Sequence, residues 1–279
     1  MNNTGRQRMI FVAAGPGRSG ADTTLRAIGT HPAVTVPSNC GPSVIASLLQ
    51  LLAHAPCEDQ TWLPRRAAQA MTDFVDRLAA TSEAGREAAA VLVRATAAQS
   101  ITIPVYGRLL MPSPLPRSRW RPLARQVLLH TAIDRSHAAV KIGPHTARLI
   151  TDVLEPGDCL LYAVRHPVET VIGLAKSKVD GMRPEEAVHY VDMSLRHART
   201  VLIGTAAATV VIQLEQLVSE PDAVLSEVAR TAELPHDDWL AQARATLPTD
   251  VDCIPRWEHP HARGHLDQLT ALAADWGYA

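Results

Sequence analysis

The segment Met9–Pro32 constrains the fold of this chain more than any other. Its apolar run Met9–Ala14 has the composition of a buried strand, and the run stops at the glycine-rich turn Gly15–Gly20. A helix-compatible stretch follows and ends near Gly29. Glycines let a backbone approach an anion closely, and the start of a helix offers unpaired N–H groups to it. The segment therefore predicts a strand, a phosphate-binding loop and a helix, with a plain strand-to-helix turn as the alternative.

The loop differs from the P-loop of nucleotide triphosphatases, which places Lys and then Ser or Thr after its last glycine. Here Gly20 is followed by Ala21 and Asp22. The loop instead resembles the 5′-phosphosulfate loop of sulfotransferases that use 3′-phosphoadenosine 5′-phosphosulfate (PAPS). His31-Pro32 stands where that family has His-Pro. The matching loop positions are Gly15, Arg18, Ser19 and Gly20.

Two features of the loop depart from the family pattern. Gly17 stands where the family usually has proline, and Ala21-Asp22 stand where two hydroxyl residues usually contact the 5′ phosphate. Thr23 and Thr24 are the next available hydroxyl groups. The carboxylate of Asp22 is electrostatically unfavourable beside a phosphate.

Length and composition set the broad class of the protein. The chain has 279 residues, of which 47% are hydrophobic, enough for a sizeable core. It has no run of about 18 apolar residues and no apolar signal segment near its start, so we expect a cytoplasmic protein without a membrane span. A net charge of −1 gives no electrostatic argument for binding nucleic acid or an acidic membrane. The four widely spaced cysteines predict neither a disulfide framework nor a zinc site.

The rest of the chain predicts an α/β fold. Alanine-rich sequence over about residues 60–100 predicts a helical insertion, and the five prolines of Ile101–Pro122 predict an irregular loop. Apolar strands then alternate with helical patterns, which indicates a central parallel sheet flanked by helices. The expected strands are His137–Ile142, Cys159–Val164 and Thr209–Leu214, and the expected helices include Arg125–Ala132, His145–Leu154, Pro167–Val179 and Arg183–Gly204.

The end of the strand Cys159–Val164 carries the second part of the resemblance. Sulfotransferases have Arg, then Asp or Asn, then Pro at such a strand end, and the arginine holds the 3′ phosphate of PAPS. Here Arg165 and Pro167 match, while His166 replaces the acidic or amide residue. Gly173 stands at the position of a serine ligand, and Ser177, one turn later, is its possible substitute. A planar guanidinium suits bidentate phosphate binding, and a surface ion pair is the alternative role of Arg165.

Two further segments resemble the family. In Val140–His145, Lys141 could stabilise the sulfuryl oxygens and His145 could deprotonate the acceptor, although the histidine follows the lysine at a different spacing from that of the cytosolic enzymes. The segment around Glu215 resembles an architectural stretch of the fold, and Arg263-Gly264 resembles the closing loop near the 3′ phosphate. No acidic residue lies between His31 and Gln50, where many relatives have one. The polar candidates left there and just after are Asn39, Cys40 and His54.

The resemblance implies a single-domain, P-loop-like sulfotransferase fold over residues 1–279. It implies transfer of a sulfuryl group from PAPS to a hydroxyl or amine of a small molecule, leaving the 3′,5′-bisphosphate PAP, without a metal ion. A bacterial enzyme of specialised metabolism fits best, and sulfation could activate a hydroxyl for later displacement or ring closure. The implied catalytic residues are Arg18, Lys141 and His145, and the implied donor-binding residues are Gly15, Arg18, Ser19, Gly20, Thr23, Arg165, Ser177, Arg263 and Gly264.

Two other functions stay open at this point. The altered phosphate loop also suits a non-catalytic sulfotransferase-like protein that binds a nucleotide or a partner. A small-molecule kinase is the second alternative, although the Lys-Ser/Thr pair and an obvious magnesium carboxylate cluster are missing. The acceptor, the oligomeric state and any partner subunit are not determined by the sequence, and a homo-oligomer is compatible with it.

Overall fold

The computed structural model describes residues 8–37, 42–58, 63–129, 135–143, 153–177, 181–205, 207–235, 238–249 and 255–278. The chain divides into two compact units, which are described separately. The first unit comprises Met1–Met9, Thr35–Val140 and Leu149–Leu154, and the second comprises Ile10–Val34, Lys141–Arg148 and Glu155–Ala279. One domain over the whole chain stays a prediction.

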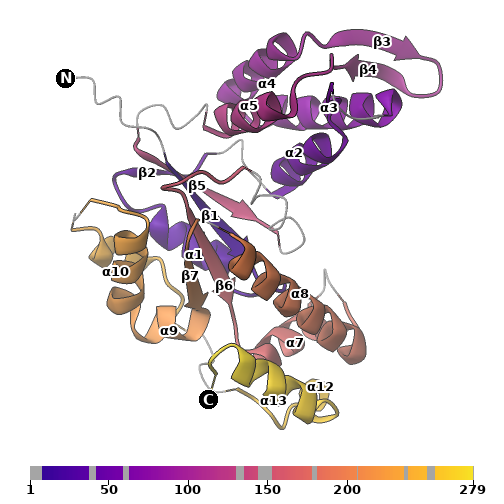
Figure 1. The fold of residues 1–279 in the computed structure, drawn as a ribbon. Coiled ribbons are helices and arrows are strands. Elements are labelled where there is room, and N and C mark those ends of the chain that lie inside the picture. Colours follow the sequence, from indigo (N-terminus) through magenta and orange to yellow (C-terminus); the bar gives the residue numbers. More distant parts are fainter. Residues whose placement is uncertain are drawn as a thin grey trace. The chain divides into compact units, whose positions relative to one another are not determined.

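A five-stranded sheet has the strand order β2-β5-β1-β6-β7 (Figure 1). β1 runs parallel to β6 with Ala14 opposite Ala163, and β6 runs parallel to β7 with Val164 opposite Gln213. The parallel arrangement predicted from the alternation of strands and helices is confirmed. The strands are β1 (Arg8–Ala14), β2 (Val34–Thr35), β5 (His137–Ile142), β6 (Cys159–Val164) and β7 (Ala208–Gln213).

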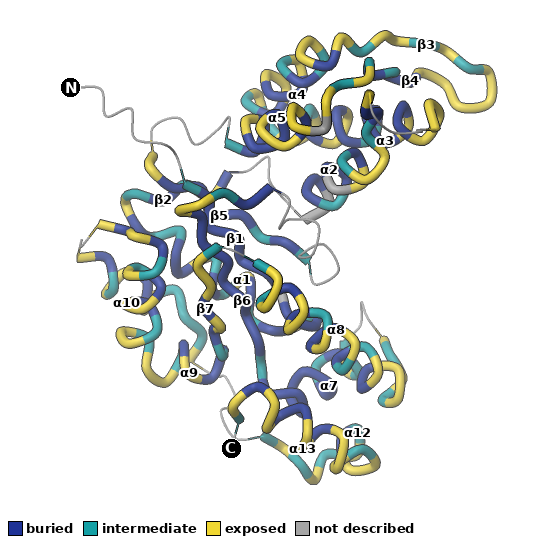
Figure 2. The backbone as a smooth tube through the Cα atoms, in the orientation of Figure 1, coloured by how far each residue is buried: buried dark blue, intermediate teal, exposed yellow. Residues whose placement is uncertain are grey.

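The two central strands are the most buried part of the second unit. Met9–Ala13 and all of β6 are buried, and Tyr162 is the largest fully buried side chain. Figure 2 shows β1 and β6 in the colour of buried residues, while the outer helices carry the exposed ones. Both strands are continuous apolar runs because helices cover both faces of a parallel sheet.

Helices surround the sheet in the second unit. α1 contacts β6, α9 and α10 contact β7, and α7 packs against α8, α12 and α13. Helices α7, α8, α10 and α12 each begin at a proline, which suits the first helical position because no intrahelical hydrogen bond is lost there. The helices of this unit are α1 (Ala21–Ile28), α7 (Pro167–Lys176), α8 (Pro184–Gly204), α9 (Leu214–Ser219), α10 (Pro221–Thr231), α11 (Leu240–Ala245), α12 (Pro260–Arg263) and α13 (Leu266–Asp275).

The first unit is mainly helical, as the alanine-rich sequence predicts. α3 packs against α2, α4 and strand β4. A buried hydrogen bond of 2.8 Å from the backbone N–H of Leu110 to Oγ1 of Thr72 joins β4 to α3. The elements are α2 (Pro42–His54), α3 (Pro64–Ala79), α4 (Glu83–Ala95), β3 (Gln99–Ile103), β4 (Gly107–Met111) and α5 (Arg117–Leu129).

The prediction of an irregular loop over Ile101–Pro122 is wrong. β3 and β4 form an antiparallel hairpin there, and α5 begins at Arg117. Pro104 lies in the hairpin turn, so the ladder loses no hydrogen bond to it, while Pro122 lies inside α5. The expected helix His145–Leu154 falls almost entirely on residues outside those described.

Candidate functional site

The loop after β1 needs its first glycine because the neighbouring strand approaches closely. The backbone N–H of Gly15 donates a 2.8 Å hydrogen bond to the carbonyl oxygen of Ala163. A Cβ added to Gly15 would lie 2.8 Å from that same oxygen. Only glycine fits this approach without a backbone shift, so the contact ties the start of the loop to the end of β6.

The last glycine of the loop shapes the start of α1. Gly20 has a φ of 89° and occupies the N-cap, where it supplies no side-chain cap. A Cβ there would lie 2.7 Å from Cδ1 of Leu214. Ser19 is buried, and Thr23 is half-buried in the first turn of the helix. The helix therefore begins without a side-chain cap, an arrangement suited to an anionic ligand.

Arg18 and Ser177, both predicted from the sequence, are brought together. Arg18 has a φ of 71° and an exposed side chain, and its Nη2 donates a 2.7 Å hydrogen bond to Oγ of Ser177 at the end of α7. A Cβ added to Gly173 would lie 3.6 Å from Cγ of Arg18. The position of the expected serine therefore lies beside the arginine stem, and Ser177 supplies a hydroxyl one turn later.

Lys141 reaches the same loop from β5. Its Nζ lies 2.6 Å from Oδ2 of Asp22 in the first turn of α1. The lysine side chain is 20% exposed and the aspartate side chain 74% exposed. The structure therefore places Lys141 beside the phosphate-loop helix, but paired with a carboxylate whose role the sequence did not indicate.

Arg165 lies at the same edge of the sheet, directly after β6. Its Nη2 is 3.7 Å from Oε2 of Glu169, and its Nε is 4.0 Å from Oε1 of Glu215. Within the described part of the chain, the buried Nε has no hydrogen-bond partner. The arginine is thus held between two carboxylates by charge, with unused hydrogen-bonding capacity.

Glu169 joins Arg165 to a second arginine that the sequence analysis missed. Its buried carboxylate accepts hydrogen bonds from the backbone N–H, Nε and Nη2 of Arg256, at 3.0, 3.1 and 2.6 Å. Burial raises the pKa of Glu169, but the hydrogen bonds from Arg256 and the charges of Arg256 and Arg165 outweigh it, so the net pKa lies below its usual value. No motif marks Arg256, because its position depends on a helix far away in the sequence.

His166 caps α7 in place of the expected acidic or amide residue. Its Nδ1 accepts a 3.3 Å hydrogen bond from the N–H of Val168, and its ring packs edge-on against Trp257 and Tyr278. Burial lowers the pKa of His166 to about 4, against the raising effect of the Glu169 charge. The neutral imidazole therefore serves as the hydrogen-bond acceptor at the N-cap.

Glu215 ties the C-terminal tail to this region. Its two carboxylate oxygens accept hydrogen bonds from the backbone N–H of His166 at 3.0 Å and from the hydroxyl of Tyr278 at 3.1 Å. Burial, the Glu215 charge and this hydrogen bond raise the pKa of Tyr278. The tyrosine therefore stays a donor, which agrees with the architectural role expected for the Glu215 segment.

The remaining predicted residues are not joined to this arrangement. Arg263 and Gly264 are exposed at the end of α12, which packs against α7. The phosphate role of Arg263 stays a prediction. His145, Asn39 and Cys40 lie outside the described residues, and His54 ends α2 in the first unit.

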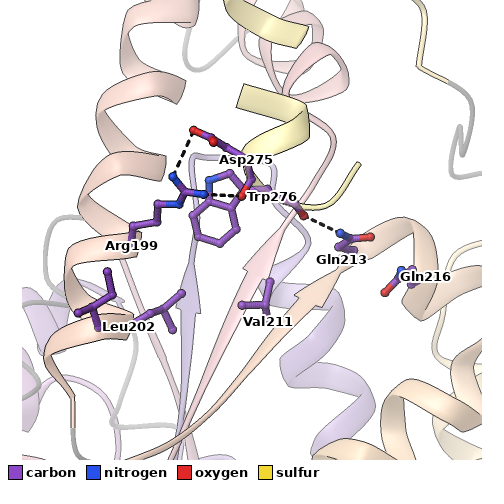
Figure 3. Close-up of a pocket in the computed structure, with 8 residues that line it drawn as sticks. Arg199, Leu202, Val211, Gln213, Gln216, Asp275 and Trp276 are labelled. Carbon is purple, nitrogen blue, oxygen red and sulfur yellow. Dashed lines mark hydrogen bonds and ion pairs between the residues drawn. The ribbon is translucent and has the colours of Figure 1, made fainter. Parts of the chain in front are cut away.

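A separate pocket of about 400 Å³ lies beside the edge strand β7 (Figure 3). Leu202, Val211 and Trp276 form its apolar walls. Arg199 at its rim pairs with Asp275, with 3.3 Å between Nη1 and Oδ2. None of the residues predicted for donor binding or catalysis lines this pocket, so the candidate site is the strand-end region around the loop.

None of the described helices is long and apolar enough to cross a membrane. No group of three or more His, Cys, Asp or Glu residues within the described ranges is arranged to hold a metal ion.

Comparison with solved structures identifies sulfotransferases as similar folds. The sulfotransferase domain from the curacin biosynthetic pathway matches with a TM-score of 0.57 and 14% identity, over 98% of this chain and 99% of that one. The sulfotransferase domain from the Synechococcus PCC 7002 olefin synthase matches with 0.51 and 15% identity, over 99% and 89%. Sulfotransferase STF9 from Mycobacterium avium matches with 0.52 and 11% identity, over 98% and 76%.

No protein-family model and no curated protein sequence matches the chain. The structural similarity nevertheless extends over nearly the whole chain. The predicted fold class, an α/β sulfotransferase fold with a central parallel sheet flanked by helices, is confirmed.

Proposed function

We propose that this protein is a sulfotransferase that moves a sulfuryl group from PAPS to a hydroxyl or amine of a small molecule. One observation carries the proposal. β1 and β6 are parallel neighbours, so the glycine loop after Ala14 and Arg165 after Val164 emerge at the same edge of the sheet. Ligands of open α/β sheets bind at the carboxyl ends of the strands.

The residues at the loop fit the 5′ end of the donor. Gly15 and Gly20 let the loop pack closely against Ala163 and Leu214, and the start of α1 has no side-chain cap. In the proposal, Gly15, Ser19, Gly20 and Thr23 hold the 5′ phosphate through backbone N–H and hydroxyl groups. Helix-start N–H groups favour an anion at this position.

The residues at the end of β6 fit the 3′ phosphate. Arg165 has an Nε without a hydrogen-bond partner among the described residues, and a guanidinium suits bidentate phosphate binding. Ser177, Arg263 and Gly264 complete this set in the proposal. Ser177 also holds Arg18, so one hydroxyl connects the two ends of the site.

Bound PAPS would supply an activated sulfuryl group and a phosphate leaving group. Arg18 and Lys141 stabilise the negative charge that develops on the transferring oxygens and on the leaving oxygen. Lys141 is held near the start of α1 by Asp22, and Arg18 is held by Ser177. Such positioning of charge accounts for most of the catalysis in comparable phosphoryl transfers. His145, the proton acceptor that the family resemblance suggests, lies outside the described residues.

The acceptor class is the least specific part of the proposal. Two of the similar structures come from a curacin biosynthetic pathway and an olefin synthase, which supports a role in bacterial specialised metabolism. A sulfate ester is a good leaving group, so sulfation can prepare a hydroxyl for displacement or ring closure. The acceptor is therefore proposed to be a small molecule with a nucleophilic hydroxyl or amine.

One observation favours a second function, a non-catalytic protein that binds a nucleotide or a partner. The exposed carboxylate of Asp22 lies at the start of α1, where its charge repels a phosphate, and it forms an ion pair with Lys141. Arg165 is likewise between two carboxylates. In both places a carboxylate already neutralises the cation that an anionic ligand would contact, which weakens anion binding.

Calorimetric titration with PAP, the desulfated donor, tests the proposal. We expect PAP to bind much more tightly than ATP, and Arg165→Ala to weaken PAP binding at least tenfold because a charged hydrogen-bonding partner is lost. Arg230→Ala is the control, since Arg230 pairs with Glu227 on exposed α10. Absence of PAP binding to the wild-type protein contradicts the proposal and favours a partner-binding role.

A further inference from the structure

Asp22 occupies a position that the donor-binding role does not explain. It stands two residues after Gly20, in the first turn of α1, and its side chain is 74% exposed. The helix dipole stabilises a negative charge there, but that charge repels a phosphate bound at the helix start. A carboxylate at this place therefore reduces donor affinity unless it contributes to the reaction.

The contact with Lys141 limits where this carboxylate can act. Oδ2 of Asp22 lies 2.6 Å from Nζ of Lys141. An ammonium has three donors, so Lys141 can contact Asp22 and an oxygen of the transferring sulfuryl group at the same time. Two oxygens bound to one ammonium lie within about 6 Å of each other. A sulfuryl group held by Lys141 can thus receive a nucleophile that also lies within hydrogen-bond distance of Asp22.

We propose that Asp22 is the general base of the reaction, a role that rests on the proposed sulfotransferase function. The proton of the acceptor O–H moves to a carboxylate oxygen of Asp22 while the acceptor oxygen forms a bond to sulfur. The bond between sulfur and the bridging oxygen breaks, and its electron pair stays on the departing 5′ phosphate of PAP. The ammonium of Lys141 contacts both the carboxylate and a sulfuryl oxygen throughout.

Among the described residues, the charged groups near Asp22 include Arg18 of the loop, four residues before it. Lys141 from β5 contacts Asp22, and Arg26 lies one helical turn further along α1. Among the neighbours of α1, β6 carries no charged side chain, and Arg244 of α11 pairs with Asp222.

The test compares Asp22→Asn, Asp22→Glu and His145→Ala with the wild-type protein. Asp267→Asn is the matched control, because Asp267 is also an exposed aspartate in the first turn of a helix, α13. The first measurement is PAP binding at low ionic strength. We expect Asp22→Asn to bind PAP two- to tenfold more tightly than wild type, since a like charge beside the phosphate is removed, and Asp267→Asn to be unchanged.

The second measurement is the release of PAP from PAPS with water as the acceptor probe, from pH 4 to pH 9. We expect Asp22→Asn to slow release at least 100-fold and to remove the acidic limb of the profile, while Asp22→Glu restores part of the rate. A wild-type rate and acidic limb in Asp22→Asn overturn the proposal, as does loss of that limb in His145→Ala alone. Failure of wild-type protein to bind PAP instead contradicts the proposed function itself.

Discussion

Two pairs of cations at the edge of the sheet differ in the partners that hold them. At the loop, Arg18 contacts the hydroxyl of Ser177, and Lys141 contacts the largely exposed carboxylate of Asp22. At the end of β6, Arg165 and Arg256 share Glu169, whose side chain is 1% exposed. The loop cations are therefore held by groups in contact with solvent, and the other pair by a buried carboxylate.

The difference in burial predicts which substitutions mainly affect folding stability and which mainly affect ligand binding. Removing a buried charge leaves its partners desolvated and unpaired, which costs folding free energy. Exposed pairs contribute little to stability because water and salt replace the lost partner. Changes to the buried Glu169 should therefore act first on folding, and changes to the loop side chains first on ligand binding.

The largest effect on stability is expected for Glu169→Ala. The change removes the partner of both arginines, and we expect the free energy of unfolding to fall by about 2–3 kcal/mol, allowing for the half-exposed side chain of Arg256. Urea unfolding measures it. Glu227→Gln, an exposed member of the Arg230 pair, should show no measurable change. A loss as small as that of the control would mean that the buried network is not a stability element.

Gly20→Ala tests whether the loop backbone is as tolerant as its side chains. Both the φ of 89° and the Leu214 side chain, 2.7 Å from an added Cβ, oppose alanine, so we expect a loss of about 2 kcal/mol. Gly204→Ala meets open space in α8 and should gain about 0.5 kcal/mol. Equal thermal stability of the two variants would contradict the steric argument.

A smaller effect depends on pH and concerns His166. Burial lowers the pKa of His166 from its usual 6.5 to about 4 in the folded protein, so below pH 6.5 the unfolded chain takes up a proton that the native state does not. This contribution to stability is complete above pH 6.5 and declines as the pH falls toward 4. Between pH 7 and pH 5 we expect a loss of about 1.5 kcal/mol.

His166→Asn is the variant that isolates this titration. Asparagine keeps an N-cap acceptor for α7 but does not titrate, so its unfolding free energy should fall less between pH 7 and pH 5 than that of the wild type. Urea unfolding at both pH values gives the difference. Identical pH dependence in the two proteins would show that the histidine is not held neutral by its surroundings.

The smallest effect on stability is expected for Ser177→Ala. The Ser177 hydroxyl accepts a hydrogen bond from Nη2 of the exposed Arg18, and loss of a bond to an exposed group should change the free energy of unfolding by less than about 0.5 kcal/mol. PAP affinity should fall several-fold, because Arg18 loses the partner that orients it. A large stability loss without an affinity change would remove the distinction between the two regions.

The parts of the site that could be predicted from the sequence are local. The apolar runs of β1 and β6, the glycine loop and Arg165 at a strand end follow from short patterns, and the structure places each as expected. The prolines of Ile101–Pro122 do not exclude the hairpin β3–β4, because Pro104 lies in its turn and Pro112 lies after its end. Here proline marks the limits of strands.

The partners of the charged groups could not be predicted in the same way. Arg256 contacts Glu169 from 87 residues away, and Lys141 contacts Asp22 from 119 residues away. Sequence alone determined the buried strands, the loop and the strand-end arginine, because periodicity and backbone preference act over a few residues. Only the tertiary structure decided which carboxylate each cation meets, because a contact between distant segments depends on how the sheet brings their ends together.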